Sequence, residues 1–187
     1  MTAAACFSCS NCCLQFTNPR PSNMGWYDRW RRAATPWGYV FFMEHDVEWS
    51  GDLRELLQRY EARTESFLCS SDVRADTPEW AHHHKRSAGW APEDSRSCLV
   101  QFVRFSVRLL DLVVAEARQR GNWVYCEIRA ASTCHVHREW CTMGSVKAIG
   151  ARYFGSFGYE AHAPQMRREV AAAREQGLLQ MFHPAKW

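Results

Sequence analysis

The sequence lacks long apolar runs, Gly-rich phosphate loops and a strong excess of either charge. No apolar segment reaches the roughly 18 residues that a transmembrane helix requires, so the sequence predicts no membrane-spanning helix. A signal peptide is not predicted either, because the N-terminus has neither a basic region nor a long apolar core. The net charge is only +3 and the basic residues are scattered, which argues against a nucleic-acid partner.

The residues that are present suit one globular domain. The chain has 187 residues, of which 47% are hydrophobic and 23% are charged, and a chain of this length can bury a sizeable core. Trp and Phe are plentiful, with nine and ten copies. Core packing is the commoner explanation for such residues, although sugar-binding clefts also use them. Composition alone therefore leaves the function open.

Cysteine is abundant, and its count of nine is odd, so at least one thiol stays free or pairs outside the chain. Four of these residues crowd the N-terminus, at Cys6, Cys9, Cys12 and Cys13. They could form a soft-metal site or a palmitoylation patch. We favour a disordered Cys-rich leader over residues 1–22, because this segment contains Ser, Asn and Thr and ends in a Pro-containing linker.

A second group of Cys and His residues lies within 134–141. If this segment is helical, Cys134, His137 and Cys141 share one face and could hold zinc. A Cys134–Cys141 disulfide in an oxidising compartment and two buried thiols in a helix are the alternatives. The zinc interpretation would make the chain a small Cys/His zinc-binding protein.

Hydrophobic periodicity predicts an α/β fold in which a mixed sheet is flanked by helices. Aromatic and β-branched runs predict strands at 39–43, 67–69, 122–128 and 178–182. Amphipathic spacing predicts helices at 26–34, 51–63, 95–120, 130–142 and 166–176. Residues 72–94 are polar and contain Pro, which predicts a long surface loop.

Two carboxylates follow the predicted strand at 39–43. An ionised carboxylate is costly to bury without a partner, so Glu44 and Asp46 are expected at the C-terminal end of this strand. Ligands bind at that edge of open α/β sheets. Residues i and i+2 of a strand point the same way, so both carboxylates can face one site. Hard oxygen ligands in such a pair favour Mg²⁺ or Mn²⁺.

This stretch resembles the metal-binding Asp-x-Asp region of GT-A type glycosyltransferases, the nucleotide-diphospho-sugar transferase superfamily. It is most similar to a poorly characterised family with an E-x-D-V-x-W-x-G-D motif. The similar stretches are FMEHDVEWSGDL at 42–53, LCSSDVR at 68–74, YCEI at 125–128 and FHPAK at 182–186. Their order and spacing match over residues from about 26 to the C-terminus. The resemblance implies an incomplete GT-A (Rossmann-like) domain over residues 23–187.

The resemblance also implies an activity and a cofactor. A sugar would pass from a nucleotide-sugar donor, with a UDP-sugar as the first expectation, to a hydroxyl of a glycan or another acceptor, and Mn²⁺ or Mg²⁺ would assist. Asp46 would be the main metal ligand, and Glu44 would touch the ribose or reach the metal through water. His183 would complete the metal coordination, and Lys186 would sit against the phosphates. Without the resemblance, Glu44 and Asp46 could equally cap the following helix and pair with Arg, and His183 could be a surface residue.

Three further residues are expected near the substrates. Glu127, at the end of a predicted strand, is the candidate general base, because an inverting transfer needs a carboxylate to take the acceptor's proton. Asp72 is the second candidate for contact with the acceptor. Arg104 and Arg108 are four residues apart in a predicted helix, where they could face the phosphates or form a solvated edge. A structural ion pair is the alternative role for Glu127.

The sequence departs from the family in its N-terminal part. GT-A domains begin with β-α-β units that hold the base and ribose, whereas residues 1–38 show no such pattern. We therefore expect the N-terminal part of the domain to be truncated or different. A non-catalytic remnant or interaction module of the fold is the alternative to an active transferase. The resemblance leaves a Golgi and a cytoplasmic location open, and the sequence does not decide between them.

Overall fold

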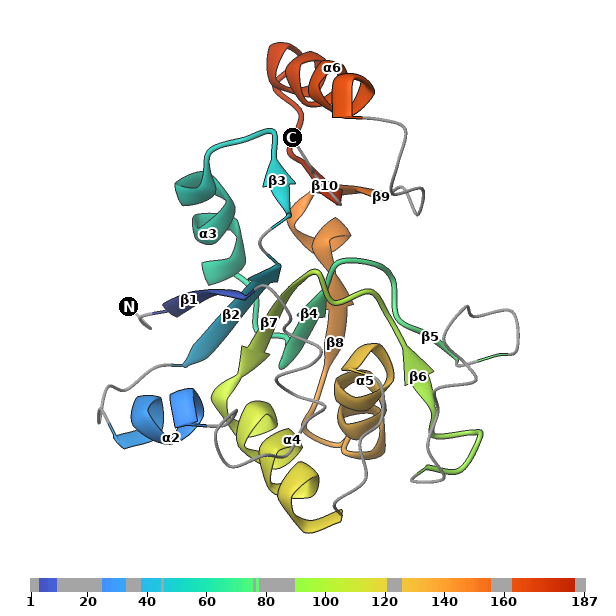
Figure 1. Ribbon diagram of the computed structural model, residues 1–187. Coiled ribbons are helices and arrows are strands. Elements are labelled where there is room, and N and C mark those ends of the chain that lie inside the picture. Colours follow the sequence, from blue (N-terminus) through green and yellow to red (C-terminus); the bar gives the residue numbers. More distant parts are fainter. Residues whose placement is uncertain are drawn as a thin grey trace.

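A sheet with both parallel and antiparallel strand pairs forms the centre of the protein (Figure 1). The computed structural model describes residues 4–9, 25–32, 38–44, 46–75, 77, 90–120, 126–155 and 163–183. Within this part of the chain, five strands form the main sheet, in the order β1 (Ala4–Cys9), β2 (Tyr39–Glu44), β7 (Phe102–Ser106), β4 (Phe67–Cys69) and β8 (Met143–Ser145). The β1–β2 and β4–β8 pairs are parallel, and β7 is antiparallel to both of its neighbours. The expected α/β fold with a mixed sheet is confirmed.

Helices cover both faces of the main sheet. They are α2 (Gly25–Arg32), α3 (Leu53–Glu61), α4 (Val107–Arg120), α5 (Cys126–Val136) and the 3₁₀ helix η3 (Val146–Ile149). Successive residues of β2 face opposite ways, so Val40 and Phe42 pack toward α4 and α5, whereas Phe41 packs with Leu56 and Tyr60 of α3. Asp52 caps α3, because its carboxylate accepts a hydrogen bond of 2.8 Å from the backbone N–H of Arg54.

A second, smaller sheet carries the C-terminal part of the described chain. It consists of β3 (Glu48–Trp49), β10 (Gln180–His183) and β9 (Arg152–Gly155). Helix α6 (Ala163–Glu175) packs on this sheet through a small apolar cluster that includes Met166, Val170 and Phe182 (Figure 1). β3 follows directly after the two carboxylates, so this sheet begins where β2 ends.

Four sequence-based expectations differ from the observed elements. Helix α4 begins only at Val107, because residues 102–106 of the expected helix form β7. Residues 126–128 of an expected strand lie in α5, while residues 121–125 fall outside the described residues. The expected loop at 72–94 contributes β5 (Arg74–Ala75), which pairs with β6 (Arg96–Ser97). Residues 4–9 of the expected disordered leader form β1.

None of the helices in the described ranges is both long and apolar enough to cross a membrane.

A network of charged and hydroxyl groups fastens α2 to α4. The Tyr27 hydroxyl donates a hydrogen bond of 2.5 Å to Asp111, and Arg31 pairs with the same carboxylate at 3.1 Å. Arg118 pairs with Asp28 at 2.8 Å and lies over the Tyr27 ring. Burial, reinforced by Asp111, raises the pKa of Tyr27 to about 12.

This shift predicts a loss of stability in alkaline solution. An unfolded chain releases the Tyr27 proton near pH 10, whereas the folded protein retains it up to about pH 12. The contribution of Tyr27 is therefore complete below pH 10 and is lost as the pH rises toward 12. We expect Tyr27→Phe to remove about 1 kcal/mol of this pH dependence, a figure reduced for partial solvent screening. Urea unfolding of both proteins from pH 9 to 12 measures the difference, and parallel pH profiles would contradict the assignment.

Candidate metal centre

Three side chains that could hold a cation meet where β2 and β10 end. The Nε2 atom of His183 lies 3.0 Å from Oε2 of Glu44 and 3.4 Å from Oδ1 of Asp46. One donor atom from each residue lies within 4.8 Å of the other two. The Glu44 side chain is 21% exposed, and those of Asp46 and His183 are 13% exposed. The cluster is therefore largely shielded from water but still reachable from it.

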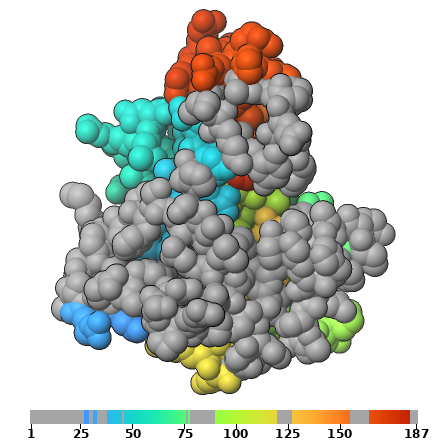
Figure 2. All heavy atoms as spheres, viewed as in Figure 1, coloured from blue at the N-terminus to red at the C-terminus, as the bar shows by residue number. Residues whose placement is uncertain are grey.

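The backbone explains why residues so distant in sequence meet. β3 pairs antiparallel with β10, with Trp49 opposite Met181 and Glu48 opposite Phe182. Continuing this register brings the next residue of β10, His183, toward the turn that holds Asp46. Figure 2 shows the cyan segment with β3 beside the red of β10 at a recess on this face.

Hydrogen bonds hold both sides of the cluster in place. The Ser50 hydroxyl donates to the carbonyl of Leu178 and accepts a bond of 2.9 Å from the N–H of Gln180. On the opposite side, the N–H of Glu44 donates to the Gln101 carbonyl at 2.8 Å. Donor atoms held by a rigid frame give a cation its ligands at a low entropic cost.

The donor set fits a divalent cation that prefers oxygen but accepts nitrogen. Two carboxylates supply negative charge, and a neutral imidazole supplies one nitrogen, a combination suited to Mn²⁺. Mg²⁺ fits the carboxylates well and the imidazole less well. Among the described residues, this is the one group of three or more such side chains close enough to share an ion.

Glu127 lies elsewhere than the sequence indicates. It occupies the first turn of α5 instead of a strand end, and its residue is only 3% exposed. The Gln101 side-chain amide donates to Oε1 of Glu127 at 3.4 Å, a long contact. Because the Gln101 carbonyl also binds the N–H of Glu44, Gln101 connects Glu127 with the cluster. Sequence reasoning missed Gln101, since the expected helix at 95–120 placed it on a helical surface.

Asp72 is an exposed residue that already has partners. Its carboxylate accepts hydrogen bonds from Lys147 and, at 2.8 Å, from the Ser145 hydroxyl. The Lys147 ammonium, together with Ser145, lowers the pKa of Asp72. A carboxylate with a lowered pKa is a weak base, so this environment suits Asp72 better for contact with an acceptor than for proton removal.

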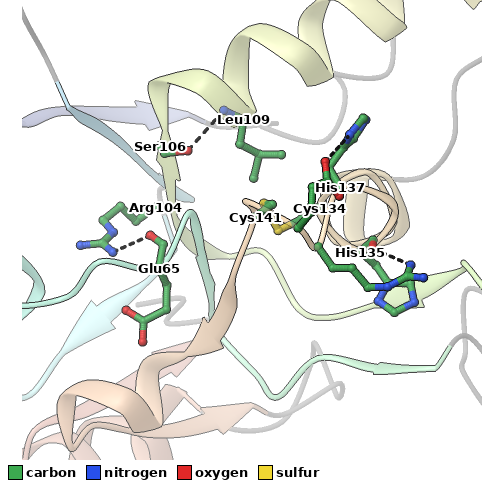
Figure 3. Close-up of a disulfide and its surroundings, with 10 residues drawn as sticks. Glu65, Arg104, Ser106, Leu109, Cys134, His135, His137 and Cys141 are labelled. Atoms are coloured by element: carbon green, nitrogen blue, oxygen red, sulfur yellow. Dashed lines mark hydrogen bonds and ion pairs between the residues drawn. A yellow bond between two sulfur atoms is a disulfide. The ribbon is translucent and has the colours of Figure 1, made fainter.

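Arg104 lies inside the molecule, where backbone carbonyls are its partners. It is 1% exposed, and its guanidinium donates to the carbonyl of Tyr60 at 2.6 Å and to that of Glu65 at 2.9 Å. Figure 3 shows the bond to Glu65. The same group lies 4.0 Å above the centre of the Tyr39 ring. The expected helical pair of Arg104 and Arg108 is wrong, because Arg104 belongs to β7 and Arg108 belongs to α4. Lys186, the other expected phosphate ligand, lies outside the described residues.

The second Cys and His group forms a disulfide. Cys134 and Cys141 are joined near the end of α5, as Figure 3 shows. Their sulfurs are therefore not available as thiolate ligands, and Nδ1 of His137 lies 3.5 Å from Glu139. Of the alternatives for this segment, the structure therefore shows the Cys134–Cys141 disulfide and not a zinc site with these two cysteines as ligands. For the N-terminal Cys group, Cys12 and Cys13 fall outside the described residues.

No protein-family model matches the chain, and no curated protein matches it significantly.

Proposed function

We propose that this chain binds Mn²⁺ or Mg²⁺ through Glu44, Asp46 and His183, and that it is a metal-dependent, GT-A-like glycosyltransferase acting on a nucleotide sugar. One observation carries the proposal: His183 lies within 3.4 Å of both carboxylates, although it comes from the opposite end of the chain. Adjacent acidic residues are common in proteins, whereas a largely shielded imidazole between them requires a dedicated arrangement of strands. The GT-A resemblance supplies the substrate class, a UDP-sugar as the first donor to test.

The chemistry assigns a task to each group. Glycosyl transfer breaks the bond between the anomeric carbon and the diphosphate, and a bound divalent cation would stabilise the charge on the departing diphosphate. Asp46 and Glu44 hold negative charge at this point, and His183 adds a neutral ligand. The acceptor hydroxyl loses its proton as it attacks the anomeric carbon, which requires a nearby base.

Glu127 remains our candidate for that base. Gln101 connects it with the strand that carries Glu44, because the Gln101 amide donates to Glu127 and the Gln101 carbonyl accepts the N–H of Glu44. An acceptor would have to displace the long Gln101 contact and the other partners of this buried carboxylate to reach it. Asp72 remains the second residue for acceptor contact, from a more exposed position.

Asp46→Asn tests the proposal directly. We expect the wild-type protein to bind Mn²⁺ saturably, and we expect the variant to bind at least about 10-fold more weakly, because it loses a charged ligand in a shielded site. Mn²⁺ electron paramagnetic resonance measures the free ion. Fluorescence of Trp49, which follows Asp46 closely and packs against the Phe102 ring, gives a second readout. UDP should tighten Mn²⁺ binding to the wild-type protein.

Asp52→Asn is the matched control, because it removes a carboxylate six residues after Asp46 in the sequence while Asn still caps α3. The control should bind Mn²⁺ like the wild-type protein. Equal weakening in both variants, or no Mn²⁺ binding by folded wild-type protein, would contradict the metal centre. Mn²⁺ binding that is indifferent to UDP would retain the metal centre but contradict the nucleotide-sugar donor and favour the interaction-module alternative.

A further inference from the structure

The side chain of Gln101 holds a buried amide oxygen without a hydrogen-bond donor. The residue is 7% exposed, and among the described residues no group donates to its Oε1 atom. The other end of the amide, Nε2, donates to Oε1 of Glu127 at 3.4 Å, a long contact. A buried acceptor without a donor carries the full cost of its lost hydration. Native proteins seldom keep such a group unless water, an ion or a ligand uses it.

The backbone places Gln101 beside a residue of the metal centre. β7 runs antiparallel to β2, with Phe102 opposite Met43 (Figure 1). The N–H of Glu44 donates to the Gln101 carbonyl at 2.8 Å, which continues this register by one residue and sets Glu44 opposite Gln101. Opposite residues of an antiparallel pair have Cα atoms about 5.5 Å apart or less, and their side chains lie on the same face.

The packing on the two faces of the sheet agrees with this placement. Val40 and Phe42 of β2 pack toward α4 and α5, and alternation along the strand puts Glu44 on that same face. The Gln101 amide reaches Glu127 in the first turn of α5, so it lies on this face as well. The Glu44 and Gln101 side chains are therefore neighbours at the end of β2.

We propose that Gln101 belongs to the metal centre, where its Oε1 atom accepts a hydrogen bond from a water molecule bound to the cation. This inference rests on the proposed metal centre and not on the identity of the sugar donor. Glu44, Asp46 and His183 offer one donor atom each, whereas Mg²⁺ and Mn²⁺ take an octahedral set of ligands in which several waters are usual. A water on the Gln101 side of the cation satisfies the amide oxygen, and the amide in turn holds that water.

One amide then connects the cation with Glu127. Nε2 donates to the Glu127 carboxylate while Oε1 accepts from the water, so a single orientation serves both contacts. The reversed amide would direct its oxygen at the carboxylate and its NH₂ group at the hydrated cation, which is unfavourable on both sides. A bound cation should therefore fix the orientation in which Gln101 donates to Glu127.

Gln101→Met tests the proposal with little change in side-chain size. The backbone bond to Glu44 stays, whereas the amide oxygen is lost. We expect the variant to bind Mn²⁺ about 10-fold more weakly than the wild-type protein, the effect typical of groups that support metal ligands from outside. Electron paramagnetic resonance measures the free Mn²⁺. Oxygen-17 relaxation of the water gives a second readout, because a bound water that has lost its acceptor should exchange with solvent faster.

Tyr60→Phe is the matched control. It also removes a buried polar atom that has no partner among the described residues, the Tyr60 hydroxyl. Tyr60 packs with Phe41, on the opposite face of the sheet. The control should bind Mn²⁺ like the wild-type protein. Unchanged affinity and water exchange in Gln101→Met, or equal weakening in Gln101→Met and Tyr60→Phe, would overturn the proposal.

Gln101→Glu keeps an oxygen acceptor at this position and decides the question if the Met variant does not fold. It should bind Mn²⁺ at least as tightly as the wild-type protein, and weaker binding would count against a role for Oε1. Asp46→Asn separates the two proposals. Mn²⁺ binding that Asp46→Asn weakens and Gln101→Met leaves unchanged overturns only the role of Gln101, whereas folded wild-type protein that binds no Mn²⁺ overturns the metal centre as well.

Discussion

Replacing Arg104 by Leu should lower the free energy of unfolding by about 3 to 5 kcal/mol. The guanidinium lies inside the molecule and donates to two backbone carbonyls, those of Tyr60 and Glu65. Leu leaves both carbonyls without these donors, and each unsatisfied buried group costs about 1 to 3 kcal/mol. The contact with the Tyr39 ring is lost as well. The midpoint of urea unfolding measures the change.

Two companion variants separate this role from others. Arg104→Lys should fall between the wild-type protein and the Leu variant, because an ammonium cannot reproduce the planar fork that reaches both carbonyls. Arg108→Met removes a cation that lies 3.9 Å above the centre of the partly buried Trp140 ring and should cost about 0.5 to 1 kcal/mol. Wild-type stability in Arg104→Leu, together with weaker binding of UDP, would instead support a phosphate-binding role for Arg104.

Removing the Cys134–Cys141 disulfide should cost about 2 kcal/mol. The bond joins residues that are seven apart, and closing so short a loop restricts the unfolded chain less than a long one would. In the folded protein it connects the end of α5 to the segment that enters β8. The double variant Cys134→Ala and Cys141→Ala should therefore unfold at a lower urea concentration than the wild-type protein when no reductant is present.

Reduction provides the control for this variant. Wild-type protein treated with dithiothreitol should approach the stability of the double variant. The stability of the variant should not change through this disulfide when dithiothreitol is added, because the bond is absent. An unchanged unfolding midpoint in the variant would show that the bond adds nothing to the native state.

The sequence predicted the elements whose patterns were unambiguous. The aromatic and β-branched run before Glu44 is a strand, and the Leu and Tyr spacing after Asp52 is a helix, as β2 and α3 show. The failure at Arg104 has a clear cause. β7 is buried on both faces, so its apolar residues run continuously into those of α4, and periodicity cannot separate a buried strand from a buried helix.

The side chains of the candidate site were predictable from the sequence, but the strand pairing that brings them together was not. The end of a buried strand was a natural position for Glu44 and Asp46, and the resemblance pointed to His183. The pairing of β3 with β10 that joins them depends on two residues of β3, too few to give a periodic signal. Glu127 was misplaced because the aromatic and β-branched residues before it favour a strand, whereas tertiary packing places it in α5.

The pairing of β10 with β3 has a consequence for how the protein is made. A chain emerges from the ribosome with its N-terminal end first, so the strands of the main sheet are available before residues 180–183 appear. The cluster of Glu44, Asp46 and His183 can close only after that final strand has docked. A cation that binds there stabilises only molecules in which docking has occurred. Metal supply during synthesis would then favour chains that contain β10 and leave prematurely terminated ones without that stabilisation.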